Sequence, residues 1–218
     1  MIIYYISHPD VVKDPAMPVP RWPLSERGRA RMAALLARPW VAGLGAVYCS
    51  DEQKALDGAA ILAGHLGLTP IVVPELGEVD RSSTGWLPEE EHAAAAQLLF
   101  ARPEESVRGW ETAAAAQERI VAAVAAIIQG ARAQGGGGAG GKEAAGDETF
   151  SPAPLLPRAP ALAVVAHGAV GTFYLCHLKG VPISMSEAQP GRDGGYYYCF
   201  DAATGHLIHG WMRIEPSP

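Results

Sequence analysis

Two apolar runs, each followed directly by a histidine, constrain the fold of this chain more than any other feature of its sequence. Residues 161–166 (ALAVVA) are apolar throughout and precede His167, and residues 2–7 (IIYYIS) precede His8. Continuous apolar runs of this length are typical of strands that are buried on both faces, as in parallel sheets covered by helices. The sequence therefore predicts an α/β fold with a mainly parallel central sheet between two layers of helices.

Further strand and helix patterns alternate along the chain, as this architecture requires. Strands are predicted at residues 46–49, 70–73, 195–201 and 206–213, and residues 202–205 join the last two as a hairpin. Helices are predicted after Ser25, after Ser50, from about Pro88, over residues 112–129 and from residue 168 to about Gly180. Ser50 and Gln53 have the spacing of a capping box at the start of the second helix.

The length and composition predict one domain that carries an insertion. The chain has 218 residues, of which 49% are hydrophobic and 18% charged, so it can build a sizeable core and is not wholly disordered. Residues 131–160 are extreme in glycine, alanine and proline, which predicts a flexible surface insertion. A phosphate-cradling glycine loop is the alternative, but Gly141-Lys142 is followed by Glu143 where that motif needs serine or threonine.

Charge and motif content exclude several classes of protein. A net charge of -6 argues against a broad nucleic-acid surface, and an anionic substrate would need cations gathered locally. No run of eighteen apolar residues suggests a membrane span, and the N-terminus lacks signal-peptide features, so we expect a cytoplasmic protein. The three scattered cysteines form no C-x-x-C pair and the histidines form no H-E-x-x-H motif, so we expect no metal site and no cofactor.

The polar residues that follow the predicted strands indicate where a ligand binds. In open α/β sheets the ligand lies beyond the carboxyl ends of the strands, and His8, Ser50 and His167 all follow such ends. Two imidazoles and nearby cations suit a phosphoryl group, because a neutral imidazole can attack phosphorus while donors neutralise the equatorial oxygens. A separate acid must then protonate the leaving oxygen.

Five segments in order carry a resemblance to a known family. They are Ile3-Tyr4-Tyr5-Ile6-Ser7-His8-Pro9, Pro23-Leu24-Ser25-Glu26-Arg27-Gly28, Val47-Tyr48-Cys49-Ser50-Asp51-Glu52-Gln53-Lys54-Ala55, Glu75-Leu76-Gly77-Glu78 and Val164-Val165-Ala166-His167-Gly168. In this order the segments resemble the motifs of the histidine phosphatase superfamily, the phosphoglycerate mutase-like proteins. The resemblance covers nearly the whole chain apart from the insertion.

The resemblance implies a role for each matching residue. His8 would be the nucleophile that becomes phosphohistidine, and His167 would contact the transferred phosphoryl group. Glu78 would be the proton donor to the leaving group, with Glu75 as a nearby competitor that matches the pattern less well. Lys54 stands where the family has its second phosphate-binding arginine. The lysine keeps the positive charge but cannot form the bidentate hydrogen bonds of a guanidinium group.

Ser-His-Pro stands here in place of the family's Arg-His-Gly. Ser7 can donate one neutral hydrogen bond but carries no charge, and Pro9 removes a backbone N–H. Arg21, in a proline-stiffened segment, is our candidate for the missing phosphate-binding cation, and Arg81 and Ser82 are weaker candidates.

The resemblance implies a metal-independent phosphatase that hydrolyses phosphomonoesters through a phosphohistidine. The partner would be a phosphorylated small molecule or a phosphoprotein, and the sequence leaves a homodimer open. The alternative is a phosphate-binding pseudoenzyme of the same fold with little turnover, which the loss of the first arginine favours. A phosphoglycerate mutase fits less well, because no carboxylate-binding cluster is evident.

Overall fold

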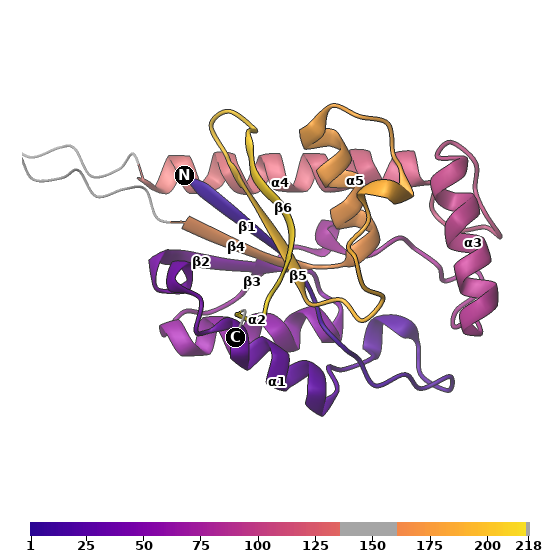
Figure 1. The fold of residues 1–218 in the computed structure, drawn as a ribbon, viewed down its shortest axis with the longest axis horizontal. Helices are drawn as coiled ribbons and strands as arrows, with labels where there is room; N and C mark the ends of the chain where they lie inside the picture. Colours follow the sequence, from indigo (N-terminus) through magenta and orange to yellow (C-terminus); the bar gives the residue numbers. More distant parts are fainter. Residues whose placement is uncertain (136–160, 217–218) are drawn as a thin grey trace, which may run out of the picture.

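Six strands form one sheet in the order β3-β2-β4-β1-β5-β6 in a computed structural model that describes residues 1–135 and 161–216 (Figure 1). The strands are β1 (Ile2–Ser7), β2 (Leu44–Cys49), β3 (Ile71–Val72), β4 (Ala161–Ala166), β5 (Tyr196–Asp201) and β6 (Leu207–Arg213). Strands β1 to β4 pair in parallel, whereas β5 is antiparallel to β1 and to β6. The predicted α/β class with a mainly parallel sheet is confirmed.

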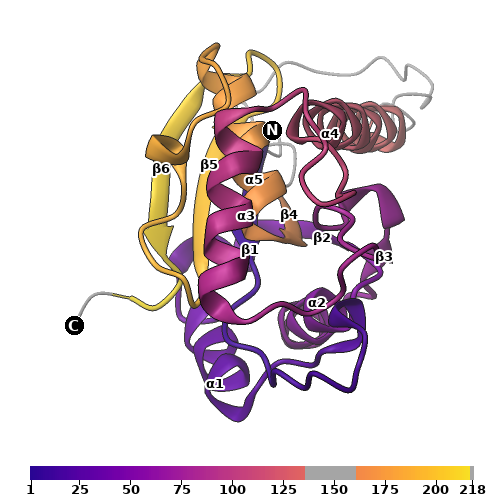
Figure 2. The same ribbon diagram turned by 90° about the vertical axis from the view of Figure 1, so that its right-hand side faces the viewer.

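Five α-helices cover the sheet, and they are α1 (Glu26–Leu35), α2 (Gln53–Leu66), α3 (Glu89–Ala101), α4 (Ala113–Gly135) and α5 (Gly168–Lys179). Helices α1 and α2 lie on one face and α4 and α5 on the other (Figures 1 and 2). Helix α3 stands beyond the carboxyl ends of the strands and packs on α5, where the rings of Phe100 and Phe173 lie 5.0 Å apart. The three predicted layers are therefore present.

The central strands alternate between two cores, which explains why their sequences contain almost no polar residue. Tyr5 and Val164 pack with α4 and α5, whereas Ile6 and Val165, their neighbours in sequence, pack with α1 and α2. All four residues are fully buried. Because successive side chains of a strand point to opposite faces, a strand between two helical layers needs apolar residues at every position.

Most helix boundaries follow the predicted signals, with one error. The Ser25 hydroxyl accepts a hydrogen bond from the Gly28 N–H at 3.0 Å and begins α1, and α5 ends at Gly180 in the left-handed conformation. The predicted capping box is wrong, because Glu52 is the N-cap of α2 and no side chain caps that helix. The hydroxyl of Ser50 bonds instead across the sheet to His167.

Two predicted boundaries also shift. The third strand is reduced to the two exposed residues of β3, which is an edge strand of the described sheet. Helix α4 continues to Gly135, past its predicted end at Gln129, and takes up residues 131–135 of the predicted insertion. Residues 136–160 lie outside the described part of the chain. Within the described ranges, every helix is too short or too polar to cross a bilayer.

A buried arginine ties three distant segments together. Arg31 of α1 is only 7% exposed, and its guanidinium forms ion pairs with Asp10 (Nη1 to Oδ2, 2.7 Å) and with Glu215 near the C-terminus. The same group donates to the carbonyl oxygen of Gly194 at 3.0 Å. Arg31 therefore connects the segment after β1, the segment before β5 and the end of the chain.

Candidate active site at the carboxyl edge of the sheet

Strand pairing brings the two sequence-predicted histidines together. His8 follows β1 and His167 follows β4, which are neighbours in the sheet, and the His8 N–H donates to the Ala166 carbonyl at 2.9 Å. The two imidazole rings meet edge to face with their centroids 5.2 Å apart. Both rings therefore lie beyond the carboxyl ends of the parallel strands, where α/β folds place their ligands.

His8 has the proton arrangement of a nucleophile. Its Nδ1 lies 2.9 Å from the Pro9 carbonyl oxygen, and because a carbonyl only accepts, Nδ1 carries the proton and Nε2 keeps its lone pair. Burial, followed by the charges of Lys54 and Arg81, lowers the pKa of His8 to about 4, although the Pro9 carbonyl and Glu52 act in the opposite direction. At neutral pH the ring is therefore uncharged, with a free lone pair at Nε2.

His167 has one satisfied ring nitrogen and one without a partner. Its Nε2 lies 2.7 Å from the hydroxyl oxygen of Ser50, which in turn accepts the Glu52 N–H at 3.4 Å. The Ser50 hydroxyl is therefore the hydrogen-bond partner of Nε2. Among the described residues nothing bonds to the Nδ1, although the residue is fully buried. A buried polar nitrogen without a partner is costly, so its position indicates a ligand contact.

Glu78 lies at the start of the helix that follows His167. Its carboxyl oxygens accept hydrogen bonds from the N–H groups of Ala169 at 3.1 Å and Val170 at 3.2 Å, and from its own neighbour Val79 at 3.0 Å. The first N–H groups of a helix have no partner within the helix and carry partial positive charge, so a carboxyl group is well held there. Glu75, the competitor, is exposed and lies against α4 instead.

Lys54 faces the site but is already paired. Its ammonium group is 4% exposed, forms an ion pair with Glu52 (Nζ to Oε2, 2.5 Å) and donates to the Val19 carbonyl at 2.8 Å. Glu52 also lies 3.3 Å from the Nε2 of His167 and accepts the Glu78 N–H at 2.8 Å. Burial raises the pKa of Glu52, but His167, Lys54 and the Glu78 N–H outweigh burial and bring it to about 2. The sequence reasoning missed Glu52, because in the matched motif it occupies a variable position.

Ser7 has a partner that the sequence did not reveal. Its hydroxyl donates to Gln189 Oε1 at 2.6 Å and accepts the Tyr196 N–H at 3.2 Å. With its oxygen engaged, Gln189 has its amide nitrogen free to donate, and a Cβ placed on Gly168 would lie 2.8 Å from that nitrogen. Gln189 therefore brings a neutral donor to the start of α5. No local motif marks Gln189, since only the fold brings its loop to Ser7.

The charge of Arg81 acts on both histidines, whereas the role expected for Arg21 stays a prediction. Arg21 is exposed, and within the described ranges its side chain makes no hydrogen bond or ion pair. Arg81 is half-buried with its guanidinium 5.6 Å from the Trp110 ring centroid, and its charge lowers the pKa of both His8 and His167. Ser82 is exposed and its N–H donates to a neighbouring carboxylate.

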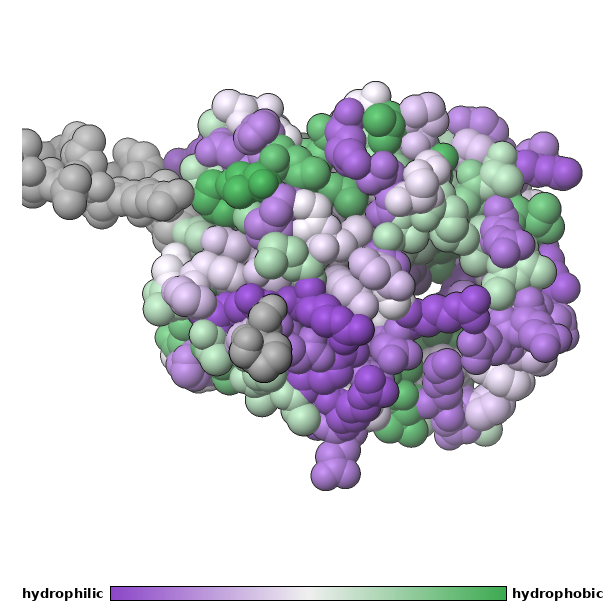
Figure 3. All heavy atoms as spheres, in the orientation of Figure 1, coloured by the Kyte–Doolittle hydropathy of each residue, from purple (hydrophilic) through white to green (hydrophobic). Residues whose placement is uncertain are grey.

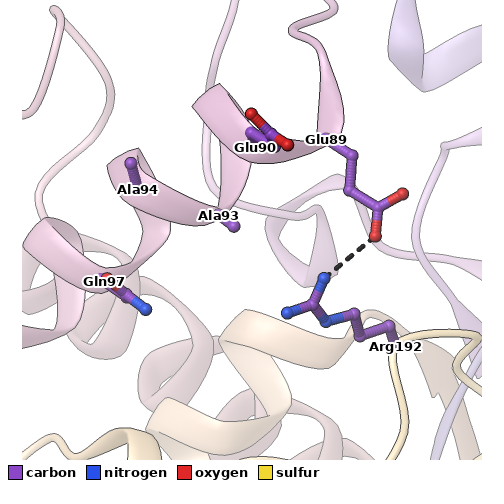
Figure 4. A pocket seen from close by; sticks show the side chains of 6 residues that line it. All are labelled: Glu89, Glu90, Ala93, Ala94, Gln97 and Arg192. Carbon is purple, nitrogen blue, oxygen red and sulfur yellow. Dashed lines mark hydrogen bonds and ion pairs between the residues drawn. The ribbon is translucent and has the colours of Figure 1, made fainter.

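The loop before β5 supports His8 through a close backbone approach. Gly194 has φ +64°, and a Cβ there would lie 1.9 Å from the His8 carbonyl oxygen, so only glycine fits. The same loop borders a pocket of about 570 Å³ against α3, across which Arg192 donates to Glu89 at 2.9 Å (Figure 4). The molecular surface is hollowed between α3 and the body of the molecule (Figure 3). Neither histidine lines this pocket.

The site combines an uncharged imidazole with a free lone pair, buried polar groups and a carboxyl group at a helix start, which are groups that could carry out displacement at phosphorus. The described ranges contain no group of three or more His, Cys, Asp or Glu side chains arranged to hold a metal ion.

Comparison with known families and structures agrees with this geometry. The model of the histidine phosphatase superfamily (branch 1) matches residues 19–135. No curated protein matches the chain.

Solved structures share the fold at low sequence identity. Mycobacterial glucosyl-3-phosphoglycerate phosphatase in complex with inorganic phosphate is 19% identical with a TM-score of 0.73, and the match covers 99% of each chain. Bacillus stearothermophilus YhfR is 19% identical with a TM-score of 0.67, covering 99% of this chain and 98% of that one. Phosphoserine phosphatase of Entamoeba histolytica, in complex with 3-phosphoglyceric acid, is 13% identical with a TM-score of 0.64, covering 97% and 96%.

Proposed function

Because the chain belongs to branch 1 of the histidine phosphatase superfamily, we propose that it hydrolyses phosphomonoesters through a phosphohistidine formed on His8, without a metal ion. Family membership and the phosphatases among its structural neighbours support phosphatase activity. The observation that carries the finer proposal is the pair of imidazoles 5.2 Å apart, one with a free Nε2 lone pair and the other with a buried Nδ1 that lacks a partner.

In the first step the Nε2 of His8 attacks phosphorus and the bond to the leaving oxygen breaks. That oxygen takes a proton from the carboxyl group of Glu78. The phosphoryl oxygens are held by the Nδ1–H of His167 and the charges of Lys54 and Arg81, while the Ser7–Gln189 pair supplies neutral donors. The Nδ1–H of His8 stays hydrogen-bonded to the Pro9 carbonyl oxygen. This hydrogen bond disperses the positive charge that develops on the ring.

In the second step water attacks the phosphohistidine. The carboxylate of Glu78 removes a proton from the water, the P–N bond breaks, and the electron pair returns to Nε2 of His8. Inorganic phosphate then leaves and both groups are back in their starting states.

For the substrate we propose a phosphorylated small molecule or a phosphoprotein side chain. Two of the structural neighbours, a glucosyl-3-phosphoglycerate phosphatase and a phosphoserine phosphatase, are phosphatases of small organic phosphates, which favours the first of these classes. The pocket between α3 and Arg192 lies beside the proposed phosphoryl site and offers room for the organic part.

A phosphate-binding pseudoenzyme remains the second candidate, and one observation favours it. The Glu52 carboxylate pairs with Lys54, so the lysine that replaces the family's arginine does not offer its full charge to a phosphate. Turnover of a generic aryl phosphate by the wild-type chain, with EDTA present to remove stray metal, separates the two candidates. Equal rates for the wild type and His8→Ala would support the pseudoenzyme.

The pH dependence of kcat/KM should show an acidic limb near pH 4. His8 must be unprotonated to attack, and its lowered pKa of about 4 keeps it so well below the usual histidine range. The nucleophilic form of His8 is thus fully present above this value, and the activity that depends on it is lost as the pH falls through it. The measurement is kcat/KM for an aryl phosphate from pH 3.5 to 8, corrected for the ionisation of the substrate. A limb near the ordinary value of 6.5 would contradict the geometry assigned to His8.

Gln189→Ala should lower kcat/KM by about tenfold, because a neutral hydrogen bond is worth about 0.5–1.5 kcal/mol. The loss comes from the amide donor beside Gly168 and from the freed Ser7 hydroxyl. Steady-state kinetics on the same aryl phosphate measures the effect. Gln129→Ala on α4, at an exposed glutamine that does not line the pocket beside α3, is the matched control and should retain full activity. Equal rates for the two variants would remove Gln189 from the phosphate site.

A further inference from the structure

The carboxylate of Glu52 lies behind His167, on the side away from the unpartnered Nδ1. It is 3.3 Å from Nε2, and it is held by Lys54 and by the Glu78 N–H. Its side chain is 10% exposed, so water screens this contact only weakly. His167 therefore contacts the buried carboxylate of Glu52 through Nε2, while its Nδ1 has no partner among the described residues. The ring can thus connect Glu52 to a bound ligand.

The proposed phosphoryl site is short of positive charge. Ser7 replaces one family arginine, and Lys54 is paired with a carboxylate. Arg81 is the remaining cation whose charge reaches both histidines in the described ranges. A dianion bound between His8 and His167 therefore needs a further positive charge, and His167 is the group that touches both the anion and a buried acceptor.

We propose that His167 takes up a proton from solvent when a tetrahedral dianion binds, and that Glu52 is the positioning residue that makes this uptake favourable. The inference rests on the proposed function, since it concerns the same phosphoryl site. In the free site the Ser50 hydroxyl donates to Nε2. In the bound site Nε2 carries the added proton and donates to Glu52, while Nδ1–H donates to the anion.

The charged and titratable groups that face His167 decide the sign of the effect. They are His8 after β1, Glu52 before α2, Lys54 in α2 and Arg81 after the loop from β3. Without an anion, burial, assisted by the charges of Lys54 and Arg81, keeps the pKa of His167 well below its usual value, although Glu52 raises it. A bound dianion adds a negative charge on the opposite side of the ring, so the affinity for the dianion rises as the pH falls.

Sulfate is the probe, because it is a tetrahedral dianion that does not titrate between pH 5 and 8. Calorimetric titration of the full chain in buffers of different ionisation enthalpy counts the protons taken up. Toward the acid end of this range we expect about one proton per sulfate, with the affinity rising about tenfold per pH unit over the steep part. In Glu52→Gln the uptake should fall below about half a proton and the affinity should become nearly independent of pH.

Three variants control the experiment. Asp51→Asn removes an exposed charge from the adjacent position and should leave the uptake unchanged. Glu52→Asp keeps a carboxylate and should restore part of the uptake, which shows that the charge matters and not the fold. His8→Ala should still take up the proton, whereas His167→Gln should not, which assigns the proton to His167.

The opposite pattern overturns the inference. If Glu52 merely neutralises the pocket, Glu52→Gln frees Lys54 and binds sulfate more tightly at every pH, with uptake as in the wild type. Unchanged uptake in Glu52→Gln, or no sulfate binding at any pH, contradicts the proposal. Because the readout is binding, it is independent of turnover. If the wild type takes up a proton but does not turn over, the inference holds and the phosphatase proposal fails. If it turns over without proton uptake, the phosphatase proposal holds and the inference fails.

Discussion

His8→Ala should lower the turnover of an aryl phosphate at least about a thousandfold, because loss of a covalent nucleophile removes more than about 4 kcal/mol of transition-state stabilisation. The free Nε2 lone pair of His8 is the attacking group in the proposed reaction, and no other described imidazole lies near it except His167. The Nε2 of His167 is occupied by Ser50, so this ring does not substitute as the nucleophile.

The phosphoenzyme gives a second readout that is independent of the rate. After rapid acid-free quenching, mass spectrometry should find a phosphoryl group on the wild-type peptide that contains His8 and none in His8→Ala. His65→Ala removes an exposed histidine of α2 and should keep both the activity and the phosphopeptide. A His8→Ala variant that hydrolyses the ester as fast as the wild type, or a phosphoryl group found elsewhere, would refute the phosphohistidine mechanism.

Arg31→Ala should lower the free energy of unfolding by about 3–5 kcal/mol, the usual cost of removing one partner from a buried ion pair. The substitution leaves the carboxylates of Asp10 and Glu215 and the carbonyl of Gly194 without their donor. Urea unfolding followed by circular dichroism measures the loss. Arg29→Ala, two residues before Arg31 in α1, removes a half-exposed ion pair with Asp57. This control should lower the free energy of unfolding by less than about 1 kcal/mol.

The same cluster makes the stability sensitive to acid. Burial raises the pKa of Asp10 and of Glu215, but the hydrogen bonds from Arg31 outweigh it and the pKa of each is lowered below its ordinary value of 3.8 or 4.5. This contribution is fully present above about pH 4.5 and is lost as the pH falls through the lowered values. Arg31→Ala should therefore unfold with less dependence on pH between 3 and 5, and equal slopes would place the ionic contribution elsewhere.

The sequence predicted the architecture because the relevant signals are local. The apolar runs before His8 and His167 identify strands buried on two faces, and Ser25 and Gly180 have the chemistry of helix ends. The order of the motifs also identified the histidines that the fold brings together. The capping box at Ser50 failed because a hydroxyl that fits a helix start can equally bond across the sheet, and sequence spacing does not distinguish these partners.

The parts of the site that escaped prediction depend on distant contacts. Gln189 meets Ser7 and Glu52 meets His167 only after the sheet has formed, over separations of more than a hundred residues. Arg81 was the weaker candidate in the sequence, yet it is half-buried and its charge acts on both histidines. The role expected for Arg21, whose side chain is exposed, stays a prediction.

The end of α4 and the start of β4 both lie on the side of the sheet away from the groups proposed for catalysis. Gly135 ends α4 and Ala161 begins β4 at the amino edge of the sheet, so the length of β4, about 20 Å, separates Ala161 from His167 (Figure 1). Both ends of the connection between α4 and β4 therefore lie about one strand length from His167, at the edge of the sheet opposite to the groups proposed for catalysis.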